Sequence, residues 1–121
     1  MIEFMKLDFE FDDDRGFLRQ LCHSGWCQVN VSKTKKGVSR GGHFHKKCKE
    51  AFYIISGKID IRLKKNGKEE NLIVKENDFF VIEPEVEHFF KFVEETLMVI
   101  MYDKPIEGKD GVKDIFPATE E

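Results

Sequence analysis

Apolar side chains recur at every second position in many short segments, and this alternation limits the possible folds more than any other feature of the sequence. Ile59, Ile61 and Leu63, for example, alternate with Asp60 and Arg62. A period of two is typical of a β-strand with one buried face, whereas amphipathic helices repeat at three and four. Turn residues follow roughly every eight to twelve positions, as in sandwiches and barrels. The sequence therefore predicts an all-β protein.

The expected strands can be placed from this alternation. They lie at 2–4, 7–11, 17–21, 26–31, 51–55, 59–63, 71–74, 79–82, 88–93 and 96–102. A change of parity near Met5 and Lys6 is one that a β-bulge could absorb. Asn66 and Gly67 form a good hairpin signal. The segment 51–55 is nearly all apolar, so we expect that strand to be covered on both faces.

Many short strands without a helical segment favour a double-sheet jelly roll, a barrel whose interior can hold a small ligand. The length of 121 residues suits a single domain. We expect the barrel at about residues 14–102, an N-terminal strand arm at 1–13 and an irregular C-terminal tail at 103–121. The arm would be available to pair with the sheet of a second copy, so a homodimer is expected.

Charge and cysteine content exclude several classes of function. The net charge is -3 with acids and bases interspersed, so no basic face indicates nucleic acid. Cys22, Cys27 and Cys48 form an odd set without C-x-x-C spacing, which favours reduced thiols and a cytoplasmic location. The N-terminus lacks the pattern of a signal peptide, and no apolar run approaches the roughly eighteen residues of a membrane span. Neither secretion nor membrane insertion is expected.

Three histidines and a glutamate form a candidate metal site. His43 and His45 are two residues apart, so they point to the same face of a strand and can hold one ion together. Glu50 follows after a short turn, and His88 comes from a distant strand. Zn is the expected ion, and Fe, Mn and Ni also suit imidazole. A catalytic metal, a structural metal and a metal-free hydrogen-bonded cluster are all open from the residues alone.

The pattern around this cluster resembles the cupin superfamily, whose members share the double-stranded β-helix fold. Its first signature motif is present as Gly37-x5-His43-x-His45-x4-Glu50-x6-Gly57. In the second motif His88 stands at the ligand position, whereas Asn77, Glu83 and Glu85 replace the usual glycine, proline and glycine. The resemblance implies that the loop before His88 differs from the common one while the ligand chemistry is kept.

A closer resemblance is to small cupins that act on nucleotide-linked keto sugars. It is carried by Asp14-Arg15-Gly16-Phe17, Gln28-Val-Asn30-Val-Ser32 and Arg40-Gly-Gly-His43-x-His45-Lys46. Similar segments occur in the C-terminal cupin domain of a bifunctional capsular polysaccharide synthesis enzyme, which binds zinc and is associated with epimerisation beside a sugar ketone. They also occur in sugar-nucleotide 3,4-ketoisomerases, which usually carry Gln at the position of Glu50 and are thought to work without metal. Glu50 therefore favours the metal-binding branch.

The resemblance implies an isomerase or epimerase of a nucleotide-linked 4-keto-6-deoxy sugar in polysaccharide biosynthesis. Such an enzyme must remove a proton beside the ketone and stabilise the enolate, which a metal can do as a Lewis acid. The alternatives are a non-catalytic sugar- or nucleotide-sugar-binding cupin and a metal-dependent oxygenase.

Individual roles follow from this hypothesis. The proton carrier could be a displaced ligand histidine such as His45, Tyr53 or a metal-bound hydroxide. Tyr53 has the opposite parity to Glu50, however, which favours packing. Arg40 could bind a phosphate of a nucleotide diphosphate, or it could be a solvated turn residue. The remaining polar residues expected to line the same pocket are Gln28, Asn30 and Arg62.

Overall fold

The computed structural model describes residues 1–118, and all regular secondary structure in that range is β-strand, as the alternation predicted. The strands are β1 (Ile2–Phe4), β2 (Phe9–Asp13), β3 (Gly16–Gln20), β4 (Gln28–Thr34), β5 (Ser39–Phe44), β6 (Glu50–Ser56), β7 (Lys58–Lys65), β8 (Lys68–Lys75), β9 (Phe79–Ile82), β10 (Glu87–Phe92), β11 (Thr96–Tyr102) and β12 (Phe116–Pro117). Residues 1–118 contain no helix of the length and apolarity needed to cross a membrane.

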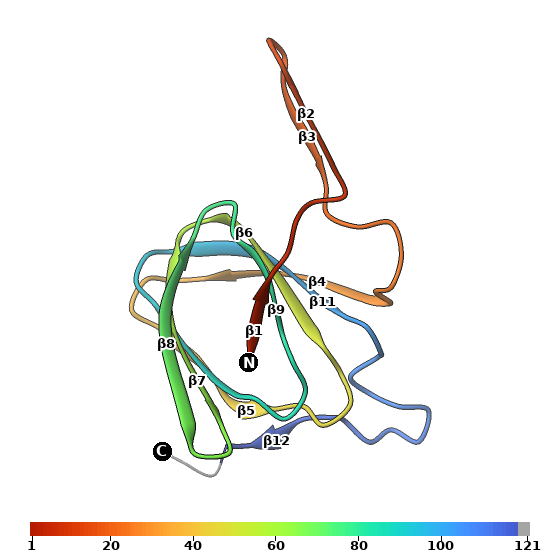
Figure 1. Ribbon diagram of the computed structural model, residues 1–121, viewed down its shortest axis with the longest axis vertical. Coiled ribbons are helices and arrows are strands. Elements are labelled where there is room, and N and C mark those ends of the chain that lie inside the picture. The colour runs from red at the N-terminus through yellow and green to blue at the C-terminus, as the bar shows by residue number, and fades with distance from the viewer. Residues whose placement is uncertain (119–121) are drawn as a thin grey trace.

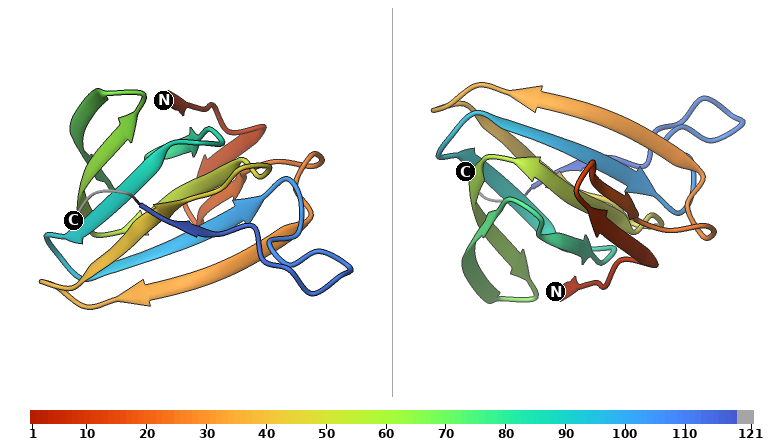
Figure 2. Two further views of the ribbon diagram at one scale, coloured as in Figure 1. Left: turned by 90° about the horizontal axis from the view of Figure 1, so that it is seen from below. Right: turned by 90° about the horizontal axis from the view of Figure 1, so that it is seen from above.

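Two five-stranded antiparallel sheets face each other and form the barrel (Figures 1 and 2). One sheet has the strand order β1-β9-β6-β11-β4, and the other has the order β12-β5-β10-β7-β8. Strands that are consecutive in the chain mostly alternate between the two sheets, as in a jelly roll. Strands β2 and β3 pair only with each other and project from the barrel as a hairpin (Figure 1). The predicted jelly-roll architecture is confirmed.

The core lies between the two sheets and is built by the predicted alternation. Ile59, Ile61 and Leu63 on β7 are fully buried, whereas the residues between them lie on the outer face. Phe80 and Phe92 fill the space from the facing sheets and are also fully buried. Burial of each such side chain stabilises the fold by roughly 1.5–3 kcal/mol. The barrel interior at this end is therefore a packed core rather than a ligand pocket.

Strand β6 is covered on both faces, as its apolar sequence predicted. Phe52 and Ile54 point into the main core, while Ala51 and Tyr53 lie on the outer face in a second apolar cluster. Residues from the segment that carries the hairpin cover this outer cluster, including Trp26. Strand β6 is thus packed on both faces, which fixes the position of Glu50 at its start.

The two ends of the chain differ from the prediction. No bulge occurs at Met5 and Lys6, because the chain leaves the barrel there, and β1 pairs with β9 of the same chain. Residues 1–13 therefore contain the edge strand β1 and the first strand of the hairpin, β2. The expected irregular tail contains β12, which pairs with β5. Residues 119–121 of that tail lie outside the described residues.

Candidate metal centre

Four side chains that could bind one metal ion converge inside the barrel, although they come from three segments of the chain. His43 is on β5, His45 follows that strand directly, Glu50 begins β6 and His88 is on β10. Their potential ligand atoms all lie within 4.8 Å of one another. Strand pairing explains part of this arrangement, because β5 and β10 are neighbours and His88 lies directly opposite His43. The cluster therefore joins the two sheets of the barrel.

The close approach of β5 and β10 depends on a glycine. The register between these strands shifts after His88, and Gly41 lies opposite Phe89 with a φ of 96°. A β-carbon on Gly41 would lie 2.6 Å from the carbonyl oxygen of His88, well inside van der Waals contact. Any other residue here would push β5 away from β10. Gly41 thus permits the pairing that brings His43 to His88.

Glu50 is the centre of the cluster. Its Oε1 atom lies 3.1 Å from Nε2 of His45 and 3.4 Å from Nε2 of His88. Its Oε2 atom accepts a hydrogen bond of 2.9 Å from the hydroxyl of Tyr102. Glu50, His45 and His88 are each at most 4% exposed, whereas His43 is half-buried. A buried carboxylate is therefore surrounded by imidazoles, and one imidazole is accessible from outside.

Backbone carbonyls orient two of the imidazoles. Nδ1 of His45 lies 2.7 Å from the carbonyl oxygen of Asp114, and Nδ1 of His88 lies 3.1 Å from that of Val86. A carbonyl can only accept a hydrogen bond, so Nδ1 carries the proton in both rings and Nε2 faces Glu50. This is the arrangement in which metal-binding histidines are usually held.

An unpartnered atom tests whether these residues fit a metal. Nε2 of His88 is buried and has no hydrogen-bond partner among the described residues. Because Nδ1 of this ring donates to a carbonyl, the neutral ring presents an unused lone pair at Nε2. Such orphaned buried atoms are rare in proteins and indicate an absent partner. A cation near Glu50 would satisfy it, so the four side chains fit a divalent metal.

The electrostatics of the cluster also suit a cation. Burial, followed by the neighbouring His88, lowers the pKa of His43 to about 4, so this imidazole is neutral at pH 7. Burial likewise lowers the pKa of His88, although Glu50 opposes the shift. Burial alone would raise the pKa of Glu50, but the hydrogen bond from His45 and the nearby imidazoles lower it overall. Burial would lower the pKa of His45, but the hydrogen bond and the charge of Glu50 raise it overall. The site therefore holds an ionised carboxylate and, at His43 and His88, neutral imidazoles, which are the ligand forms that metals bind.

The structure places Tyr53 away from the four candidate ligands. Tyr53 lies on the outer face of β6, packs against Phe79 and donates a hydrogen bond of 3.0 Å to the side-chain oxygen of Asn77. Alternation along β6 explains this, because Glu50 points inward and a residue three positions later points outward. The parity argument for packing is confirmed.

The four residues predicted to bind substrate divide between the two faces of the sheets. Arg40 pairs with buried Phe90 and so lies on the inner face of β5, where its Nε atom donates a 2.8 Å hydrogen bond to Thr34 on β4. Asn30 lies on the inner face of β4 and is exposed. Gln28 also faces inward, and its side-chain oxygen accepts a 3.0 Å hydrogen bond from the amide of Ile106.

Arg62 does not belong to the inner set, although it lines a hollow of about 430 Å³ to which Arg40 also contributes. It alternates with Ile61 and Leu63, which fill the core, so its side chain lies on the outer face of β7. There its guanidinium lies 4.3 Å from the centre of the Phe89 ring.

Two residues at the site were not predicted from the sequence. Tyr102 reaches Glu50 because β11 pairs with β6 in a register that places the two residues opposite each other. Asp114 reaches His45 from the C-terminal segment, 69 positions away in the sequence. The alternation of β11 could have placed Tyr102 on the inner face, but no local pattern indicates the contact of Asp114.

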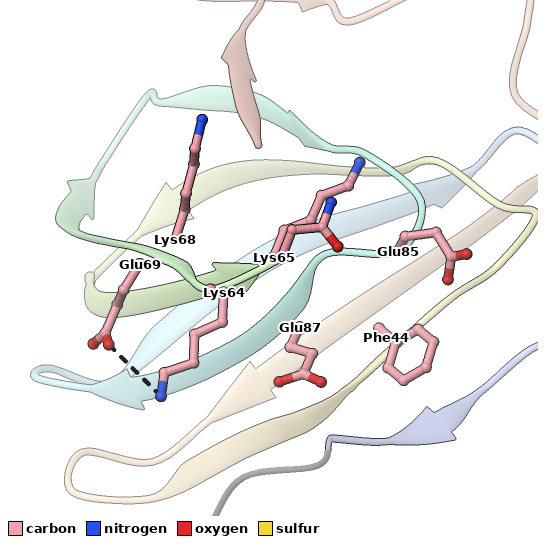
Figure 3. A pocket seen from close by; sticks show the side chains of 9 residues that line it. Phe44, Lys64, Lys65, Lys68, Glu69, Glu85 and Glu87 are labelled. Carbon is pink, nitrogen blue, oxygen red and sulfur yellow. Dashed lines mark ion pairs between the residues drawn. The ribbon is translucent and has the colours of Figure 1, made fainter.

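A separate hollow of about 550 Å³ lies on the outside of the barrel, beside the turn between β7 and β8 (Figure 3). Its lining is mainly charged, and Lys64 and Glu69 form an ion pair of 3.6 Å across it. Glu85 and Glu87, which shortly precede His88 in the sequence, contribute carboxylates to this lining. Mixed charges at an exposed surface are typical of solvated side chains, so this hollow is not part of the metal centre.

Comparisons with known proteins agree with the fold and the motifs. Residues 11–107 match the family described as the polysaccharide biosynthesis C-terminal domain. No curated protein sequence matches this chain.

Three structures illustrate the likeness of fold. A mutant of the 3,4-ketoisomerase QdtA from Thermoanaerobacterium thermosaccharolyticum, in complex with TDP-4-keto-6-deoxyglucose, has a TM-score of 0.79 at 18% identity, covering 95% of this chain and 86% of its own. The TDP-quinovose 3,4-ketoisomerase WlaRB from Campylobacter jejuni has a TM-score of 0.78 at 18% identity, covering 93% and 92%. The capsular polysaccharide assembling protein CapF from Staphylococcus aureus has a TM-score of 0.68 at 20% identity, covering 94% of this chain but 33% of its own. The shared fold is the cupin-type barrel predicted from the motifs.

Proposed function

Because the chain belongs to the polysaccharide biosynthesis C-terminal domain family, as the resemblance to sugar-nucleotide cupins implied, we propose that it isomerises or epimerises a nucleotide-linked 4-keto-6-deoxy sugar. The observation that carries the proposal is the group of three imidazoles and one carboxylate inside the barrel. The likeness to QdtA, a 3,4-ketoisomerase crystallised with TDP-4-keto-6-deoxyglucose, supports this choice of substrate class. The reaction would take place in the cytoplasm, where the three free cysteines would stay reduced.

A divalent metal, most simply zinc, would be held by His43, His45, Glu50 and His88. The orphaned Nε2 atom of His88 and the ionised Glu50 support this assignment. When bound, the metal would act as a Lewis acid on the carbonyl or enolate oxygen of the sugar.

His43 is the side chain best placed to carry the proton. It is half-buried and so can be reached from outside, whereas His45 is 4% exposed and both of its ring nitrogens have partners. Its lowered pKa leaves the ring neutral and able to accept a proton at pH 7. Of the carriers considered from sequence, a displaced ligand histidine fits best, with His43 in place of His45 or Tyr53. The proton would be taken from the carbon beside the ketone and returned to the enolate.

The nucleotide end of the substrate would lie along the inner faces of β4 and β5. Arg40 lies on β5, and its Nε atom is tied to Thr34, so the guanidinium is held in place while the residue stays exposed. A fixed guanidinium can bind the diphosphate through two parallel hydrogen bonds. Asn30 is exposed on the inner face of β4 and would contact the sugar or the base. His43 would then face the sugar ring.

The protein would act as a homodimer in which the hairpin covers a second copy. Phe9, Phe11 and Leu18 share one face of the β2–β3 hairpin and are 52%, 48% and 57% exposed. An isolated two-stranded hairpin is marginally stable in water, so this face needs a cover. Strand β4 of the second copy would provide this cover, because it lies at the edge of its sheet and its Val29 and Val31 are 60% and 70% exposed.

Product analysis tests the proposed function. The purified protein would be incubated with TDP-4-keto-6-deoxyglucose, and the sugar products would be identified by NMR. The proposal predicts a sugar with a shifted ketone or an inverted carbon beside it. Unchanged substrate together with measurable binding would favour a non-catalytic binding protein, and oxygen consumption would favour an oxygenase.

A further inference from the structure

The C-terminal segment contacts His45 of the metal centre through Asp114. The segment leaves the barrel after β11 and returns to it as β12, which pairs with β5 (Figure 1). Asp114 lies beyond residue 107, where the match to the family ends. The contacts of Asp114 therefore belong to a part of this chain that the family likeness does not cover.

The carboxylate of Asp114 binds the turn that joins His45 to Glu50. It accepts hydrogen bonds from three consecutive backbone amides: 2.9 Å from Lys46, 2.9 Å from Lys47 and 3.0 Å from Cys48. Hydrogen bonds from amides to an ionised carboxylate are stronger than those between neutral groups. Three of them converge on one side chain, so Asp114 holds the turn between the two candidate ligands in a single conformation.

The backbone of Asp114 is fixed in the same way and contacts the cluster itself. Its amide donates a 2.8 Å hydrogen bond to the carbonyl of Ile106, whose own amide donates to Gln28 on β4. Its carbonyl oxygen lies 2.7 Å from Nδ1 of His45. The carbonyl is thus anchored to the barrel at the point where it accepts the proton of the imidazole.

We propose that Asp114 is a positioning residue: its carboxylate holds residues 46–48, and its carbonyl keeps His45 in the tautomer that presents Nε2 to Glu50. This inference rests on the proposed function only in giving His45 a role as a metal ligand. Loss of the carboxylate would free residue 114 to shift and take its carbonyl away from His45. The proton of a neutral imidazole could then occupy either ring nitrogen, and the ring could rotate. Partners of this kind orient metal-binding histidines and raise their affinity for the ion.

The chain supplies a matched control in Asp103. Its carboxylate accepts a 2.8 Å hydrogen bond from the amide of Lys49, so it ties the same segment to the same turn. Its carboxylate contacts Lys49 and Lys104 rather than a histidine. If Asp114 served only to dock the segment, replacing either aspartate would have similar effects at His45.

The test compares Asp114→Ala, Asp114→Asn and Asp103→Ala as full-length proteins. NMR would detect the Nδ1-bound proton of His45, which is visible only if a hydrogen bond protects it from exchange. We expect the signal in the wild type and in Asp103→Ala, and its loss in Asp114→Ala. Asp114→Asn keeps one acceptor oxygen, should fold if the alanine variant does not, and should show a weakened signal. An unchanged signal in a folded Asp114 variant would overturn the proposal.

Zinc affinity, measured by competition with a chromophoric chelator, gives a second readout that needs no substrate. We expect roughly 10–100-fold weaker binding in Asp114→Ala, as for other partners of metal-binding histidines. Asp103→Ala should bind within about twofold of the wild type, because it keeps the Asp114 carboxylate that fixes this segment, and with it the carbonyl beside His45. Unchanged affinity in a folded Asp114→Ala protein would overturn the positioning role. If the wild type itself bound no zinc, the proposed metal would be wrong, and the NMR signal alone would decide whether Asp114 positions His45.

Discussion

Replacing Glu50 by Gln should separate metal binding from the stability of the barrel. The amide has nearly the same size, its oxygen can accept the hydrogen bond from Tyr102, and its nitrogen can donate to Nε2 of His45. One neutral hydrogen bond replaces a charged one, so the metal-free free energy of unfolding should change by only about 1 kcal/mol. The charge that attracts a cation is lost, however.

The size of the effect can be worked out for metal added at about 100 times the wild-type dissociation constant. Binding then stabilises the wild type by about 2.7 kcal/mol. For a domain of this size 1 kcal/mol corresponds to roughly 4 °C, so the melting temperature should rise by about 10 °C. If the variant binds about 100-fold more weakly, the same metal concentration stabilises it by only about 0.4 kcal/mol, or about 2 °C.

Differential scanning calorimetry with and without zinc measures both shifts. Glu87→Gln is the matched control, because Glu87 lies next to His88 on β10 but lines the outer hollow instead of the barrel interior (Figure 3). Its zinc-induced shift should equal that of the wild type. A full shift in Glu50→Gln would refute the role of Glu50 as a ligand, and no shift in the wild type would refute the metal site itself.

Three further regions give predictions. His43→Asn should lower the rate of hydrogen exchange at the reacting carbon by about 10²–10⁴-fold without unfolding the protein, and an unchanged rate would remove His43 as the proton carrier. In the metal-free protein the pKa of His43 is about 4, so its ring should be neutral at pH 6 in ¹⁵N NMR spectra; a protonated ring would contradict the electrostatics. Arg40→Ala should weaken TDP binding roughly 10–100-fold in calorimetry, and an equal loss for a free sugar would argue against a phosphate contact. Leu18→Glu should give monomers in analytical ultracentrifugation, and persistent dimers would place the interface elsewhere.

Much of the fold could be predicted because alternation reports directly on burial. The core positions of β7 follow from Ile59, Ile61 and Leu63, and the inward direction of His43 and His45 follows from their spacing of two. The same rule already placed Tyr53 outside. Arg62 lies on the outer face by the same rule, because its parity opposes that of the core residues, and there it lines a hollow with Arg40. The sequence therefore contained the correct answer for both side chains.

The remaining features depend on contacts between distant segments. Tyr102 meets Glu50 only through the register between β11 and β6, and no local pattern determines that register. Asp114 meets His45 through an irregular segment whose path depends on its hydrogen bonds to Gln28 and to the turn at residues 46–48. At Met5 the change of parity was real, but it marks the exit of the chain from the barrel and not a bulge. Tertiary contacts, rather than local preferences, set these features.

Deuterium incorporation from D₂O into TDP-4-keto-6-deoxyglucose is the most direct test of the proposed chemistry. Removal and return of a proton beside the ketone would place solvent deuterium on that carbon, as NMR or mass spectrometry would detect, and His43→Asn protein should suppress it. Tight binding of the nucleotide sugar without any deuterium incorporation by the metal-loaded wild type would contradict the account.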